Sequence, residues 1–218
     1  MNDFAATRTI GTTATSTGPE PGGLRAFLRV HTAERHARLD ARFADFAGPR
    51  TVESYRRFIA MNLLAHRELS AFFATIHDVA ATGLKTSIAT NLRHLEADRA
   101  TMDLDCPRDC SFSLFPCETS EVAGLAYVLD GSRLGARFIY RRLEKAGVLG
   151  PQDGEVSTRF LRSAFDRDAT SPEGFDISGA EDPEVKERSL AAALATFALF
   201  ERCLDRIVAH ERGQEPSR

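Results

Sequence analysis

The sequence predicts an all-α protein, built as a single-domain helical bundle. Apolar residues recur at three- and four-residue intervals over long stretches, and strong helix start and stop signals bracket those stretches. No convincing run of alternating apolar and polar residues indicates strands. The chain has 218 residues, of which 43% are hydrophobic and 27% charged, so it can form one hydrophobic core and is not a disordered chain.

The N-terminal part is expected to hold a tail and two helices. Residues 1–22 are rich in Thr, Gly and Pro, which predicts a flexible segment. From Leu24 to Phe46 the apolar spacing is helical, and a Gly-Pro pair then ends the helix. A second helix is expected to begin near Thr51, as its N-cap, and to extend to about residue 76.

Four further helices are expected over residues 86–102, 120–146, 155–165 and 182–210. Gly147 suits the position just after a helix end, where glycine readily adopts a positive φ. Asp182 and Pro183 form a strong start signal for the last helix, as N-cap and first helical residue.

The loop expected over residues 103–118 contains three of the four cysteines. The C-x3-C-x6-C spacing of Cys106, Cys110 and Cys117 matches no common zinc pattern, and no histidine lies among them. We therefore expect thiols in an irregular loop, with a metal site and a loop disulfide as the alternatives.

Charge and hydropathy narrow the classes of partner. The net charge is -3, which gives no electrostatic case for nucleic acid or an anionic membrane. No apolar run approaches the roughly 20 residues that cross a bilayer. The N-terminus has no continuous apolar region of the kind found in secretory signals, so we expect a cytoplasmic protein without nucleic-acid or membrane partners.

The helix expected over residues 120–146 contains three interior glycines, Gly124, Gly131 and Gly135, with Ser132 beside the second. Each interior glycine costs a helix about 1 kcal/mol relative to alanine, so three in one helix need a reason. Close packing of a neighbouring helix is one reason. Approach of a flat ligand to bare backbone is the other, and the spacing alone leaves both open.

The first helix carries a candidate metal ligand, His36, at the edge of its apolar stripe. Thr32 lies one turn before it and Asp40 one turn after it, on the same face. A carboxylate that accepts a hydrogen bond from one ring nitrogen presents the other nitrogen to a metal. A structural or solvent-facing histidine is the alternative interpretation, and His31 is a competing ligand on the same helix.

These two segments together resemble the haem oxygenase family, in particular its bacterial biliverdin-producing branch. Residues 24–40, with Thr-x-x-x-His at Thr32 and His36, resemble the family's proximal helix. Residues 124–136, which include Tyr-Val-Leu-Asp-Gly-Ser-Arg-Leu-Gly, resemble its distal helix. The resemblance implies a haem oxygenase-like helical domain over residues 23–212.

The resemblance implies an enzyme that degrades haem to biliverdin, carbon monoxide and ferrous iron. Haem would be both substrate and cofactor, O2 the second substrate, and a ferredoxin or a reductase the electron donor. His36 would be the proximal iron ligand, with Asp40 bonding its far nitrogen, and Arg29 would meet a haem propionate. The remaining implied site residues, all in the distal segment, are Tyr127, Gly131, Ser132 and Gly135.

One departure from the family pattern keeps an alternative open. Ser132 stands where the animal enzymes carry an aspartate that orders water over bound oxygen. A haem-binding sensor or carrier that does not degrade haem therefore remains the alternative, and a helical interaction module without haem is a third hypothesis. Arg25 is a second candidate for the propionates, whereas Arg133, Arg137 and Arg141 form a row that points away from the glycines.

Overall fold

Six α-helices make up the fold in the computed structural model, which describes residues 23–43, 50–77, 81–107, 110–114, 117–149, 156–166 and 181–214. No strand occurs within those ranges, so the predicted all-α class is confirmed for them. The tail predicted over residues 1–22 lies outside the described residues. The helices are α1 (Leu24–Ala41), α2 (Thr51–Ala74), α3 (Thr82–Thr101), α4 (Thr119–Lys145), α5 (Arg159–Ser163) and α6 (Pro183–Gln214).

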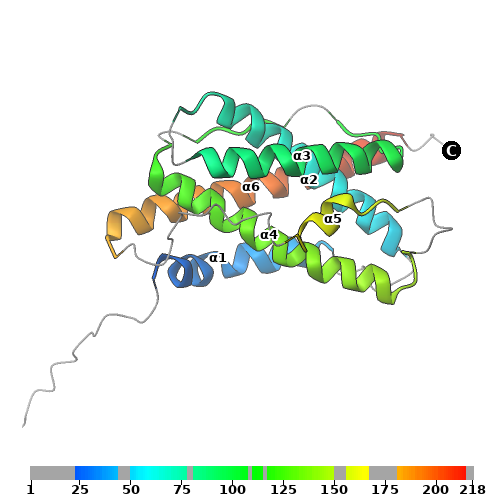
Figure 1. Ribbon diagram of the computed structural model, residues 1–218, viewed down its shortest axis with the longest axis horizontal. Coiled ribbons are helices and arrows are strands. Elements are labelled where there is room, and N and C mark those ends of the chain that lie inside the picture. Colours follow the sequence, from blue (N-terminus) through cyan, green and yellow to red (C-terminus); the bar gives the residue numbers. More distant parts are fainter. Residues whose placement is uncertain are drawn as a thin grey trace, which may run out of the picture.

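The long helices form two layers (Figure 1). α1 and α4 lie on one side of the molecule and α2, α3 and α6 on the other, with the short α5 between α4 and α3. One hydrophobic core joins the layers. α4 packs along α6, whereas α1 packs mainly on α6 and makes few contacts with α4. This uneven packing leaves room between α1 and α4.

Two predicted helix signals are confirmed and one is wrong. The Asp182 carboxylate accepts a hydrogen bond from the N–H of Glu184 (2.9 Å), as an N-cap does. Gly147 follows α4 with a φ of 72°. Thr51 is the first residue of α2 rather than its cap, because Arg50 precedes the helix and its carbonyl already accepts the first helical hydrogen bond.

Several predicted boundaries also need correction. α1 ends at Ala41 rather than Phe46, since the N–H groups of Arg42 and Phe43 bond to carbonyls three residues back and tighten the last turn. α3 begins four residues earlier than expected, at Thr82, and α5 has only five residues. Phe46 and the Gly-Pro pair lie outside the described residues.

A fully buried histidine in α2 makes the fold sensitive to acid. His66 donates through Nδ1 to the carbonyl oxygen of Asn62 (2.8 Å), and its ring packs against Phe160 and Phe200. Burial lowers the pKa of His66 from 6.5 to about 4, although the hydrogen bond that the ring donates to the Asn62 carbonyl oxygen acts the other way. The native state therefore keeps this ring neutral at a pH where the unfolded chain already binds a proton.

We expect the free energy of unfolding to fall by about 3 kcal/mol between about pH 7 and about pH 4 through His66 alone. The sign follows because the folded pKa lies below the unfolded one, so the unfolded state gains protons first as the pH falls. Urea unfolding at several pH values measures the effect. The His66→Gln variant should lose markedly less stability over the same range, and an identical slope for both proteins would contradict the assignment.

Candidate haem site

A cavity of about 1050 Å³ lies between α1 and α4. Its size is at the upper end of the range that cofactor pockets span. α2 and α6 close it on the inner side with mostly apolar side chains. Every residue that the sequence placed in the site lines this one cavity, namely Arg29, His36, Asp40, Tyr127, Gly131, Ser132 and Gly135.

The inner row of α1 explains how the first helix reaches the cavity. Leu24, Leu28 and Thr32 are buried and anchor the N-terminal half of α1 in the core. The same four-residue row continues with His36 and Asp40, which line the cavity instead. Thr32 is buried and also lines the cavity, so the row changes from core packing to cavity lining at this residue.

Two ion pairs connect the C-terminal part of α1 to α6. Arg35 Nη1 lies 2.6 Å from Glu201 Oε2, and Arg42 Nη2 lies 2.9 Å from Asp205 Oδ1. Both pairs join the cavity-lining part of α1 to α6, which also contributes Phe197 and Phe200 to the lining. They hold this part of α1 on α6 while leaving the space toward α4 open.

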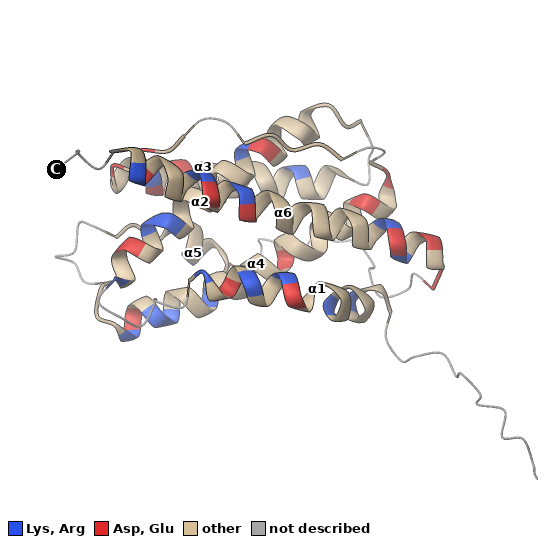
Figure 2. Cartoon of the chain, turned by 180° about the vertical axis from the view of Figure 1, so that it is seen from behind, with Lys and Arg blue, Asp and Glu red and all other residues tan. Residues whose placement is uncertain are grey.

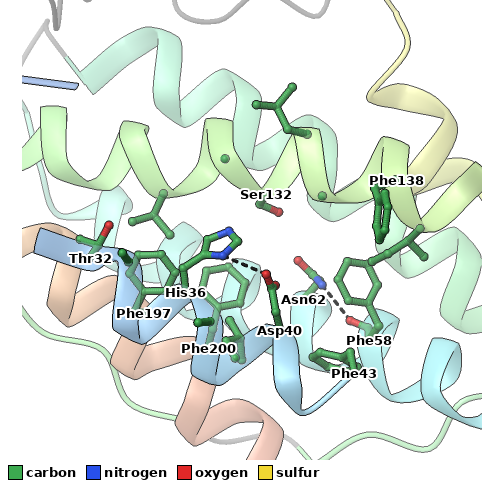
Figure 3. Close-up of a pocket in the computed structure, with 18 of the residues that line it drawn as sticks. Thr32, His36, Asp40, Phe43, Phe58, Asn62, Ser132, Phe138, Phe197 and Phe200 are labelled. Atoms are coloured by element: carbon green, nitrogen blue, oxygen red, sulfur yellow. Dashed lines mark hydrogen bonds and ion pairs between the residues drawn. The ribbon is translucent and has the colours of Figure 1, made fainter. Parts of the chain in front are cut away.

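His36 and Asp40 form a hydrogen-bonded pair at the cavity. His36 Nδ1 lies 2.9 Å from Asp40 Oδ2, and the ring packs edge-on against Phe197. Figure 3 shows the ring between α1 and α4, with its second nitrogen directed toward α4. Since the Asp40 carboxylate can only accept, Nδ1 carries a proton, and in the neutral ring the lone pair is then on Nε2, on the side of the cavity.

His31, the competing ligand, has a different environment. Its Nδ1 donates to the carbonyl oxygen of Phe27 (2.8 Å), and its ring stacks on Phe27 at a centroid distance of 4.1 Å. Both histidines are exposed, but His31 does not line the cavity. The geometry thus favours His36 over His31 as a ligand in this cavity.

The three glycines of α4 divide between the two explanations that the sequence left open. A Cβ atom at Gly124 would lie 2.0 Å from the carbonyl oxygen of Ser189, so this glycine allows α6 to pack closely. A Cβ atom at Gly131 or Gly135 would meet nothing within 4 Å. Both line the cavity, where bare backbone lets a flat molecule approach the helix.

Polar groups from α4 face the cavity beside these glycines. The Ser132 side chain lies on the cavity side of α4, opposite His36 (Figure 3). The Tyr127 hydroxyl lies 3.4 Å from the Thr32 hydroxyl, which itself donates to the carbonyl oxygen of Leu28. This contact ties α1 to α4 at one end of the cavity.

The charged residues at the cavity are mostly basic. Arg25, Arg29 and Arg142 line it, and among the described residues Asp40 is the one acid that does so. Figure 2 shows several further Lys and Arg positions along α4. The row formed by Arg133, Arg137 and Arg141 stays outside the cavity lining, as expected, and Arg137 Nε donates to the carbonyl oxygen of Ala164 (2.6 Å).

Sequence reasoning missed the inner wall of the cavity and one rim cation. The wall residues come from α2 and α6, and their helical spacing in the sequence is that of ordinary core residues. Arg142 lies six residues beyond the end of the predicted segment 124–136, and its guanidinium lies 4.6 Å from the centre of the Phe138 ring. The missed lining residues of the wall are Phe58, Met61, Asn62, Phe197 and Phe200.

The cysteines form no metal site in the part of the chain that the structure describes. All four are thiols rather than halves of disulfides, and no three His, Cys, Asp or Glu side chains lie close enough there to hold an ion together. Cys203 hydrogen bonds to Cys110, and burial raises the pKa of the Cys203 thiol.

Within the described residues, no helix combines the length and apolar character needed to span a bilayer.

The fold resembles that of a solved protein. The chain aligns with a crystal structure of the NO- and CO-bound heme oxygenase from Neisseria meningitidis, with a TM-score of 0.57 and 17% sequence identity. The alignment covers 86% of this chain and 92% of that chain. The chain has the all-helical fold of the haem oxygenases. No protein-family model and no curated protein matches its sequence. The assignment of the haem oxygenase fold therefore rests on the comparison of structures.

Proposed function

We propose that this protein is a haem oxygenase of the bacterial, biliverdin-producing kind. It would bind haem between α1 and α4 and convert it to biliverdin, carbon monoxide and ferrous iron, using O2 and electrons from a ferredoxin or a reductase. The observation that carries the proposal is the His36–Asp40 pair, which faces Gly131 and Gly135 across the cavity.

The lining of the cavity fits haem on three counts. The open backbone at Gly131 and Gly135 leaves room for a flat macrocycle, because a Cβ atom at either position would meet nothing. The inner wall is apolar and aromatic, as the hydrophobic edge of a porphyrin requires. Arg25, Arg29 and Arg142 at the cavity supply cations for the two propionates.

The side chains have separate roles in this proposal. His36 would hold the iron through Nε2 as a neutral ligand, and Asp40 would fix the ring orientation by accepting from Nδ1. Gly131 and Gly135 place no side chain on the α4 side of the cavity, and the Ser132 hydroxyl offers a hydrogen-bond donor and an acceptor beside them. Haem itself supplies, once bound, the iron that activates O2 next to its own ring.

Titration of the purified protein with hemin tests the proposal. Wild-type protein should bind hemin with an intense Soret band, and His36→Ala should weaken binding by more than about 100-fold, because removal of even a group that orients a ligand costs 10–100-fold. His31→Ala is the matched control on the same helix and should bind like wild type. Retention of the wild-type spectrum in His36→Ala would refute this ligand assignment.

Turnover separates the enzyme from the alternative of a haem-binding sensor or carrier. Hemin-loaded protein is supplied with a ferredoxin and its reductase in air, and the products are separated by chromatography. Biliverdin formation supports the oxygenase. A haem complex that survives these conditions without bilin absorption supports the sensor or carrier.

A further inference from the structure

An unpartnered acceptor lies in the inner wall of the cavity. Asn62 in α2 is 1% exposed, yet its Oδ1 atom has no hydrogen-bond partner. Asn62 lines the cavity, and Figure 3 shows the amide oxygen directed into the space between α1 and α4. A buried polar atom without a partner is costly, so its presence in a ligand cavity points to a partner on the ligand.

The amide cannot relieve this cost by turning over. Asn62 Nδ2 donates to the carbonyl oxygen of Phe58 (2.8 Å), and a rotated amide would set two acceptors against each other there. His66 holds the backbone of the same residue through its bond to the Asn62 carbonyl oxygen (2.8 Å). The side-chain oxygen is therefore fixed as an acceptor that faces the cavity.

The neighbours of Asn62 in the wall offer no hydrogen-bond donor to that oxygen. Phe58 and Met61 flank it on α2, and Phe197 and Phe200 complete the wall from α6. A flat ligand held between His36 on α1 and the glycines of α4 would meet this wall with its edge. The donor that Asn62 needs must then come from the ligand's edge or from water.

Haem has no such donor. Its four nitrogens bind iron, its edge carries methyl, vinyl and C–H groups, and its ionised propionates only accept. A linear tetrapyrrole differs, because opening the ring frees the pyrrole nitrogens from iron and leaves a lactam at each end. Pyrrole and lactam N–H groups are donors that an amide oxygen can accept.

We propose that Asn62 is a specificity-determining acceptor that favours an opened tetrapyrrole over closed haem in this cavity. The inference rests on the proposed function and extends it from the substrate to the product. In haem the Asn62 oxygen stays unpaired, whereas an N–H group of the bilin satisfies it. The wall thus stabilises the state after ring opening relative to the state before it.

The test compares the dissociation constants of hemin and biliverdin, measured by absorbance titration of wild type and of Asn62→Leu. Leucine has a similar volume and removes the acceptor. Biliverdin should bind the variant about tenfold more weakly, while hemin binds equally well or more tightly, so the preference for biliverdin falls at least about tenfold. The ligand-free variant should melt no lower than wild type, because removal of the unpartnered oxygen offsets the loss of the Nδ2 hydrogen bond to Phe58.

Met61→Leu is the matched control, since it changes an apolar residue of the same wall. It should shift both dissociation constants by one common factor. Asn62→Ala, which removes the acceptor with less volume, gives the same readout should leucine not fit.

If the ratio of the hemin and biliverdin dissociation constants is unchanged in both Asn62 variants, water satisfies the oxygen. If Met61→Leu changes that ratio as much as Asn62→Leu does, the shape of the wall alone discriminates between the two ligands. Either result overturns the inference and leaves the proposed function intact. Failure of wild type to bind hemin overturns the proposed function, and this inference with it.

Discussion

Replacing Gly124 with alanine is expected to lower the free energy of unfolding by about 3 kcal/mol or more. The new methyl group would lie 2.0 Å from the Ser189 carbonyl oxygen and 3.0 Å from the Ala192 Cβ atom. The nearest obstacle is backbone of a long helix, so it cannot rotate away as a side chain would, and α4 and α6 must move apart. Denaturant unfolding followed by circular dichroism measures the loss.

Gly131→Ala, two turns along the same helix, is the matched control and should raise the free energy of unfolding rather than lower it. A Cβ atom there meets nothing within 4 Å, so only the helix-propensity gain of up to about 1 kcal/mol remains. Equal stability of the two variants would refute the division of the glycines into a packing position and a cavity position. Because the substitution is identical, differences in the unfolded chain largely cancel.

The helices themselves could be predicted because their signals are local. Asp182 and Pro183 mark the start of α6, and Gly147 marks the end of α4, through side-chain and φ preferences that need no tertiary information. The end of α1 was missed because a tightened last turn at Arg42 and Phe43, rather than a glycine or proline, stops the helix. Such bonding leaves no signature in the spacing of apolar residues.

The candidate site, too, could be predicted only in part from the sequence. His36 and Asp40 could be paired from sequence because they lie one turn apart on one helix, and the glycines of α4 stood out by their cost. Phe58 and Phe197 could not be assigned to the cavity, since an aromatic residue that lines a pocket has the same helical spacing as one in a core. Only the distance between α1 and α4 distinguishes them, and that distance is a tertiary property.

Asn62 shows why this limit matters for function. In the sequence it is one polar residue among the apolar residues of α2, and its spacing to its neighbours assigns it no role in a site. Its role in ligand binding is inferred from the unpartnered oxygen and from the aromatic wall around it. Local signals identified the faces that would hold a ligand, whereas the wall that meets the ligand's edge required the assembled structure.

Replacing Asp98 with alanine is the second change expected to have a large effect, with a loss of about 4 kcal/mol. Its carboxylate is 0% exposed and accepts three hydrogen bonds, from Ser157 Oγ (2.6 Å), the Arg159 N–H (2.9 Å) and the Phe160 N–H (2.9 Å). These bonds cap α5 and hold it on α3. Alanine would leave all three donors without this acceptor, at about 1–3 kcal/mol for each one that stays buried.

The effect should reach the cavity, because Asp98 holds the segment whose Phe160 packs against Phe58 of the inner wall. Hydrogen exchange should therefore increase first in residues 156–166, before the rest of the fold. Asp205→Ala is the control: its exposed carboxylate pairs with Arg42, and such surface pairs contribute less than about 1 kcal/mol. Slow exchange of residues 156–166 in Asp98→Ala would mean that α5 is held by apolar packing alone.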